Sequence, residues 1–146
     1  MKHFLVLEDN EDDAFLLRRA FSSLVGCTAH VCRNESEARA YLKGAGIYAN
    51  RNRFPFPDAI ISDLRVGEES GVDFLNWVRS QQELQSIDCT LPSASASPAE
   101  LKQIEGTESL KVLHKPLEIN SLRLLIRDLC ASVEDARASA DPLTIR

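Results

Sequence analysis

Long apolar runs and an excess of positive charge are both missing from this sequence of 146 residues. No stretch approaches the roughly 20 apolar residues that a membrane-spanning helix needs. The N-terminal run MKHFLVLEDN meets acidic residues too early to be a signal peptide. The net charge of -5 provides no basic face of the kind that nucleic-acid-binding proteins present. These absences favour a cytoplasmic protein that binds neither membranes nor nucleic acid.

Cysteine and histidine are few, and neither residue type shows metal-ligand spacing. The four cysteines include no C-x-x-C pair, so buried free thiols are a better interpretation than disulfides or metal ligands. Cys27 and Cys32 stand five residues apart on a predicted strand, which directs them to opposite faces of a sheet. We interpret the three histidines as structural residues: His3, His30 and His114.

Glycine and proline are also sparse, at six residues each. With 44% apolar and 27% charged residues, the chain has the composition of one ordinary globular domain with a real core. We assign this domain to residues 1–133. Residues 134–146 lose the apolar pattern and are predicted to be a flexible tail.

Short apolar runs alternate with helical patterns along the chain. The predicted strands are His3–Leu7, Cys27–Cys32, Asp58–Asp63, Ile87–Ser93 and Leu110–Leu113. The predicted helices are 11–25, a second that is capped by Asn34 or Ser36 and runs through Leu42, 71–82, a fourth that begins at Ser97, and 118–133. The connection 44–57 contains two glycines and two prolines and is predicted to be irregular, folded back through Tyr48, Phe54 and Phe56. The alternation predicts an α/β fold, with a parallel sheet covered by helices on both faces.

Polar residues follow four of the five predicted strands. Glu8 and Asp9 follow the first strand, Asp63 the third, Ser93 the fourth and Lys115 the fifth. The carboxyl ends of parallel strands share one edge of the sheet, where α/β proteins bind their ligands. Three carboxylates at that edge would repel one another unless a cation offsets them, and Mg²⁺ is the natural partner. Each residue alone has an ordinary explanation as a cap or loop residue, but their joint placement favours a site.

A carboxylate nucleophile, a metal, a lysine and a hydroxyl are the groups that phosphoryl transfer to an aspartate requires. In this interpretation Asp63 is the nucleophile and phosphoacceptor. Ser93 and Lys115 bind the phosphoryl oxygens. The predicted metal ligands, acting directly or through water, are Glu8, Asp9, Asp63 and the backbone carbonyl of Arg65.

This pattern resembles the receiver domain of two-component response regulators, over about residues 2 to 131. The resemblance rests on Glu8-Asp9, on Asp63, on Ser93 followed by Ala94, and on Lys115-Pro116. The spacings also match, with 30 residues from Asp63 to Ser93 and 22 from Ser93 to Lys115. The segments VLEDNEDDAFLLRRAF and YANRNRFPFPDAIISDL look most like the small stand-alone receivers.

The resemblance implies a flavodoxin-like sheet of strand order 2-1-3-4-5 with five helices, and Mg²⁺ as cofactor. It implies a sensor histidine kinase or phosphotransfer protein as phosphoryl donor, and no enzymatic activity beyond the chain's own phosphorylation and dephosphorylation. Output would pass through protein contacts on the face of the fourth helix, fifth strand and fifth helix, with a downstream partner or with a second copy in a homodimer.

The sequence also allows two other functions. One is a receiver-like interaction module that works without phosphorylation, which Gly67, Pro92 and Val112 favour because they depart from the family's pattern. Pro92 also removes a ladder donor from the fourth strand. The other is a metal-dependent phosphatase, which would need a second acid two residues after the nucleophile, where this chain has Arg65.

Overall fold

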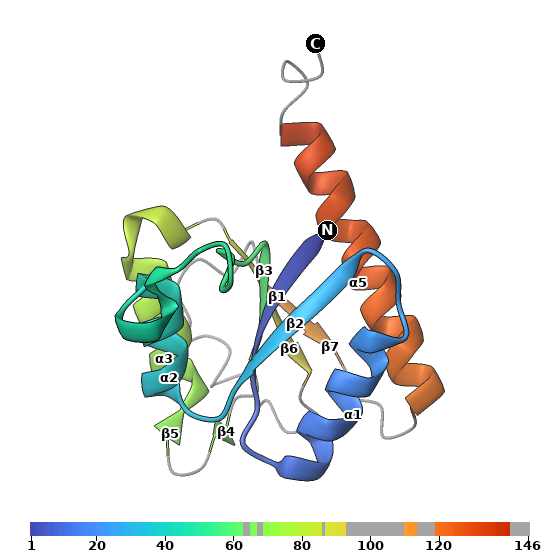
Figure 1. The fold of residues 1–146 in the computed structure, drawn as a ribbon, viewed down its shortest axis with the longest axis horizontal. Coiled ribbons are helices and arrows are strands. Elements are labelled where there is room, and N and C mark those ends of the chain that lie inside the picture. The colour runs from blue at the N-terminus through green and yellow to red at the C-terminus, as the bar shows by residue number, and fades with distance from the viewer. Residues whose placement is uncertain (63–64, 67–68, 86, 93–109, 114–118, 141–146) are drawn as a thin grey trace.

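A parallel sheet forms the centre of the molecule, in a computed structural model that describes residues 1–62, 65–66, 69–85, 87–92, 110–113 and 119–140. The strand order in this sheet is β2-β1-β3-β6-β7, and neighbouring strands are parallel (Figure 1). The strands are β1 (Lys2–Leu7), β2 (Cys27–Cys32), β3 (Ala59–Ser62), β6 (Asp88–Pro92) and β7 (Leu110–Leu113). Counted along the chain, the sheet strands have the predicted order 2-1-3-4-5, so the flavodoxin-like fold is confirmed.

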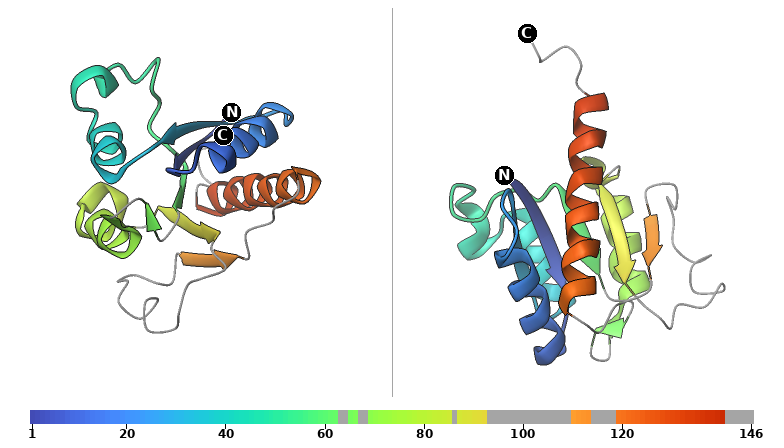
Figure 2. Two further views of the ribbon diagram at one scale, coloured as in Figure 1. Left: turned by 90° about the horizontal axis from the view of Figure 1, so that it is seen from below. Right: turned by 90° about the vertical axis from the view of Figure 1, so that its right-hand side faces the viewer.

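Helices cover both faces of the sheet (Figure 2). The helices are α1 (Glu11–Ser22), α2 (Glu35–Lys43), α3 (Gly71–Ser80) and α5 (Ile119–Ala140), with 3-10 turns η1 (Gly46–Ala49) and η2 (Gln82–Leu84). Helices α2 and α3 lie on one face, and α1 and α5 on the other. The helix predicted to begin at Ser97 lies outside the described residues. Within the described ranges, every helix is too short or too polar to cross a bilayer.

Helices α1 and α5 depart most from the ends that the sequence predicted. Helix α1 stops at Ser22, before the predicted end at Val25, because the hydroxyls of Ser22 and Ser23 donate to backbone carbonyls of the last turn. Helix α5 continues to Ala140, past the predicted end at Val133. The apolar stripe fades there, but alanine, arginine and glutamate still favour helical backbone.

Period-two alternation in the strands divides the core into two clusters. On β1, Leu5 and Leu7 pack under α2 and α3, whereas Phe4 and Val6 pack under α1 and α5. Cys32 belongs to the first cluster and Cys27 to the second, which confirms that they point to opposite faces. All four cysteines are free, as predicted.

The connection between α2 and β3 packs onto the α2 side of the sheet. Tyr48 is buried and Phe54 is packed against the core, but Phe56 is 41% exposed, so two of the three aromatic residues fold back as predicted. The prediction of wholly irregular structure is wrong for η1. The Arg51 guanidinium holds this segment, because it donates to the carbonyl of Leu42 at 3.0 Å and to that of Phe54 at 3.2 Å.

Buried Cys89 gives the fold a predicted sensitivity to alkaline pH. Burial raises the pKa of this thiol from 9.0 to about 11. The folded protein therefore keeps a proton that the unfolded chain loses, and stability falls from about pH 9 to about pH 11, by up to about 1.4 kcal/mol per pH unit. In urea unfolding, Cys89→Ala should lose less stability than the wild type over that interval. The difference in free energy of unfolding between the two proteins near pH 7 serves as the baseline. If this difference stays the same up to pH 11, the assignment to Cys89 is contradicted.

Candidate functional site

The candidate site lies where the sheet strands end. The register pairs Leu7, the last residue of β1, with Cys32 of β2 and with Ser62 of β3. On the other side of the sheet, Pro92 of β6 pairs with Leu113 of β7. The carboxyl ends of these parallel strands therefore meet at one edge, the lower edge in Figure 1.

An acidic pair follows β1 at this edge. Glu8 is only 3% exposed, and Asp9 is half-buried. The backbone N–H of Glu8 donates to the carbonyl of Cys32 at 2.9 Å, which continues the β1–β2 pairing by one residue. The Glu8 Oε2 atom accepts the backbone N–H of Asn10 at 3.2 Å. Because a buried carboxylate is costly without cations or hydrogen-bond donors around it, this pair fits a site for a hard divalent cation.

The start of α1 fixes the backbone that follows the acidic pair. The Asn10 side chain caps the helix by accepting the backbone N–H of Asp13 at 2.9 Å. The Glu11 carboxylate pairs with Arg33 at 2.7 Å, and this hydrogen-bonded cation lowers the pKa of Glu11. Glu11 therefore has its own counterion in Arg33.

Three predicted site residues, Asp63, Ser93 and Lys115, lie outside the described residues. Each follows a sheet strand within two residues in the chain, after Ser62, Pro92 and Leu113 respectively. The other three predicted site residues are Glu8, Asp9 and Arg65. The structure brings Glu8 and Asp9 to the carboxyl edge of the sheet.

Arg65 lies in a small antiparallel ladder that the sequence analysis missed. It belongs to β4 (Arg65–Val66), which pairs with β5 (Glu69–Ser70), with Arg65 opposite Ser70. Two residues separate these strands, the commonest length for a β-hairpin connection, and one of them is Gly67. That glycine is the signal from which the hairpin could have been predicted.

No family model matches this sequence, and a search of curated proteins also found no match. Solved structures do resemble it. The phosphorylated cyanobacterial phytochrome response regulator RcpA is 26% identical, with a TM-score of 0.74 over 88% of this chain and 90% of that one. The bacteriophytochrome response regulator RtBRR is 27% identical, with a TM-score of 0.67 over 88% and 78%. The Mn²⁺-bound form of response regulator Rcp1 is 19% identical, with a TM-score of 0.72 over 88% and 91%.

These neighbours are response regulators, and the similarity extends over most of the chain. They support a role in two-component signalling. The resemblance predicted from the strand-end residues is therefore confirmed at the level of the whole structure: the chain has the fold of a response regulator receiver domain.

Proposed function

We propose that this protein is a single-domain response regulator that accepts a phosphoryl group on Asp63 from a histidine kinase or phosphotransfer protein. The observation that carries this proposal is the register of the sheet. Leu7 pairs with Ser62, and these are the residues directly before Glu8 and Asp63 in the chain. The acidic pair and the proposed phosphoacceptor thus follow two paired strand positions at the edge where α/β proteins bind ligands.

In the proposed reaction, a carboxylate oxygen of Asp63 attacks the phosphorus atom of a phosphohistidine. The O–P bond forms as the P–N bond breaks, and the imidazole nitrogen leaves with the electron pair of that bond. The Lys115 ammonium and the Ser93 hydroxyl bind the phosphoryl oxygens, so that the transferred group is held in line with the attacking atom. The product is an acyl phosphate on Asp63.

Glu8 and Asp9, together with Asp63 and the Arg65 carbonyl, form a set of oxygen ligands suited to Mg²⁺. When bound there, Mg²⁺ would neutralise charge on the phosphoryl oxygens and on the clustered carboxylates. The burial of Glu8 beside the half-buried Asp9 supports this assignment. The Mn²⁺ in the similar Rcp1 structure also supports a divalent metal.

The signal would then pass by protein contacts in the cytoplasm. The face that we propose for these contacts comprises β7, α5 and the predicted fourth helix, and it would meet a downstream protein or a second copy of the chain.

One observation favours a second candidate function, a module that binds partners without phosphorylation. Pro92 occupies the end of β6, opposite Leu113, where it offers no backbone N–H to the edge of the site.

Intact-protein mass spectrometry tests the proposal. After incubation with a small phosphodonor and Mg²⁺, the wild type should gain one phosphoryl group, and Asp63→Asn should gain none. Asp73→Asn, the same chemical change at an exposed position of α3, is the matched control and should be phosphorylated like the wild type. Omission of Mg²⁺ should prevent the gain. If the folded wild type gains no mass with any donor, the phosphorylation-independent module replaces this proposal.

A further inference from the structure

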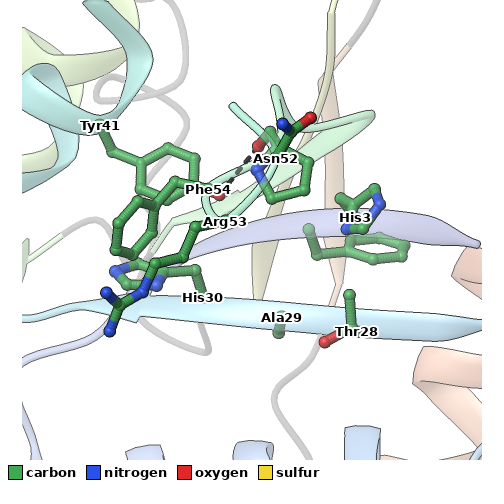
Figure 3. Close-up of a pocket in the computed structure, with 10 residues that line it drawn as sticks. His3, Thr28, Ala29, His30, Tyr41, Asn52, Arg53 and Phe54 are labelled. Atoms are coloured by element: carbon green, nitrogen blue, oxygen red, sulfur yellow. Dashed lines mark hydrogen bonds between the residues drawn. The ribbon is translucent and has the colours of Figure 1, made fainter. Parts of the chain in front are cut away.

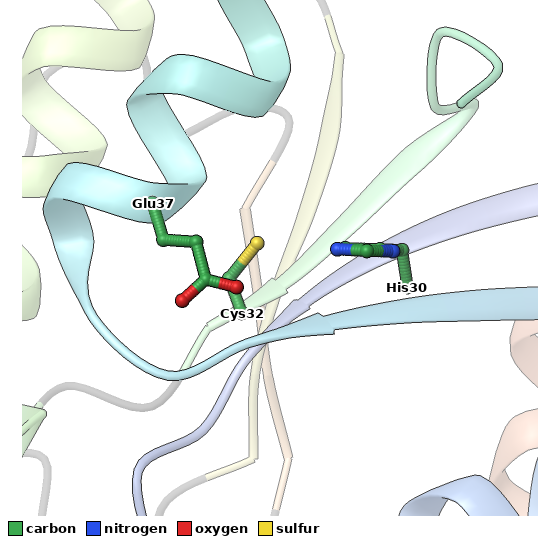
Figure 4. Close-up of side chains that lie close together, drawn as sticks. All are labelled: His30, Cys32 and Glu37. Carbon is green, nitrogen blue, oxygen red and sulfur yellow. The ribbon is translucent and has the colours of Figure 1, made fainter. Parts of the chain in front are cut away.

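Three side chains that the proposed phosphorylation does not use come together between β2 and α2. His30 and Cys32 are two residues apart on β2 and therefore lie on the same face of the sheet. Glu37 comes from the first turn of α2, which packs over that face. A nitrogen of His30, the sulfur of Cys32 and a carboxylate oxygen of Glu37 all lie within 4.8 Å of one another (Figure 4).

The His30 ring has an unsatisfied nitrogen in this cluster. Its Nε2 atom is buried and has no hydrogen-bond partner. Figure 4 shows the outer end of the ring directed toward Cys32 and Glu37. Since a buried polar atom without a partner destabilises a fold, a ligand at this nitrogen would remove that cost.

Aromatic rings and a cavity lie on the His30 side of the cluster. The rings of Tyr41, Tyr48 and Phe54 lie 4.7, 5.6 and 5.8 Å from the His30 ring, measured between centroids. A cavity of about 360 Å³ adjoins the cluster on the His30 side, where His30, Tyr41 and Phe54 line it (Figure 3). The Glu37 carboxylate accepts long hydrogen bonds of 3.5 Å from the Tyr48 hydroxyl and from the Arg33 backbone N–H. These contacts orient the carboxylate but are weak enough to leave it available to an ion.

We propose that His30 Nε2, Cys32 Sγ and a Glu37 carboxylate oxygen bind a divalent transition-metal ion of the zinc type, with water as the fourth ligand. Imidazole, thiolate and carboxylate are all ligands that Zn²⁺ accepts, and three protein ligands with one open position form a recurrent zinc geometry. The thiolate and carboxylate together balance the charge of the ion. Mg²⁺ has no preference for sulfur or nitrogen, so this site selects a different metal from the acidic pair.

Binding requires small movements of the ligands. With metal–ligand bonds of about 2.0 to 2.3 Å, tetrahedral ligand atoms lie roughly 3.3 to 3.8 Å apart, so atoms that lie up to 4.8 Å apart must approach by at most about 1.5 Å. Glu37 is only partly buried at the start of its helix, and its side chain can make most of this movement. The Cys32 S–H bond breaks as the metal–sulfur bond forms, and one proton is released to solvent.

The proposed site adjoins the acidic pair through the backbone, since the carbonyl of Cys32 accepts the N–H of Glu8. A test must therefore separate the two. We would add Co²⁺, a coloured substitute for Zn²⁺, to the reduced full chain in the presence of excess Mg²⁺, and record the absorption spectrum. A thiolate-to-cobalt charge-transfer band reports a Co–S bond, which the oxygen ligands of the acidic pair cannot produce. Zn²⁺ should then displace the cobalt and abolish the band.

Single substitutions test whether Cys32 and Glu37 form the proposed metal site. Cys32→Ala should remove the charge-transfer band, whereas Cys27→Ala, on the opposite face of β2, should keep it. Glu37→Gln, a change of similar size at a partly buried position, should weaken Zn²⁺ binding at least tenfold in calorimetry, whereas Glu83→Gln, at an exposed position of η2, should not. The proposal is overturned if the wild type shows no charge-transfer band, or if Glu37→Gln binds Zn²⁺ as tightly as the wild type. Because the readouts are a Co–S bond and Zn²⁺ affinity, they do not depend on phosphorylation of Asp63.

Discussion

Asp9→Asn should slow phosphorylation by a small phosphodonor about a hundredfold or more, while Asp12→Asn should leave the rate nearly unchanged. Both substitutions remove one negative charge and preserve the size of the side chain. Asp9 is half-buried beside Glu8 at the carboxyl edge of the sheet, whereas Asp12 is exposed in the first turn of α1. Loss of a partner that only supports a metal ligand already costs 10- to 100-fold in affinity or activity, so loss of a ligand itself should cost at least as much.

The same pair of variants separates metal binding from general electrostatics. Without Mg²⁺, Asp9→Asn should be about as stable as the wild type, because the relieved repulsion among the acidic residues is offset by the lost attraction between Asp9 and Arg33. With Mg²⁺, thermal unfolding of the wild type and of Asp12→Asn should shift upward, and that of Asp9→Asn should shift much less. Equal rates and equal Mg²⁺-induced shifts in the two variants would show that Asp9 does not contribute to a metal site.

The sheet and its two faces could be predicted from the sequence because both depend on short-range periodicity. Alternating burial along β1 sends Leu5 and Phe4 to different core clusters, and the same rule separates Cys32 from Cys27. The strand order followed from the resemblance to receiver domains, and the pairings of β1 with both β2 and β3 confirm it. Glu8 could be placed at the edge because it directly follows a short apolar strand.

Features that depend on long-range or weak local signals were missed. The β4–β5 pair involves only two residues on each strand, so it leaves no periodicity to detect. The final turns of α5 have helical propensity without an apolar stripe, and the stripe was the signal that set the predicted end. The His30 cluster needs Glu37 from the following helix, a contact that spacing within one strand does not reveal. The roles of Asp63, Ser93 and Lys115 stay predictions from the strand-end pattern.

Arg79→Met should lower the free energy of unfolding by about 3 kcal/mol. The buried Arg79 guanidinium donates hydrogen bonds to three backbone carbonyls before β6, and the substitution removes this donor. Arg79 is 8% exposed, and its Nη1 atom lies 3.2, 3.1 and 2.9 Å from the carbonyl oxygens of Leu84, Gln85 and Ile87. That nitrogen carries two hydrogens, so the three contacts share them. Methionine fills a similar space but donates nothing, and it would leave these carbonyls without the charged donor that now joins them.

Urea unfolding measures the loss, and two further variants show its cause. Arg127→Met, at an exposed position of α5, removes the same charge and should change stability by less than about 0.5 kcal/mol. Arg79→Lys keeps a positive donor but not the planar geometry, and should recover only part of the loss. A full recovery by lysine would show that charge alone matters, and an unchanged Arg79→Met would show that water replaces the guanidinium. Because Ile87 directly precedes β6, the strand that leads to Ser93, loss of this anchor should also slow phosphorylation of the folded variant.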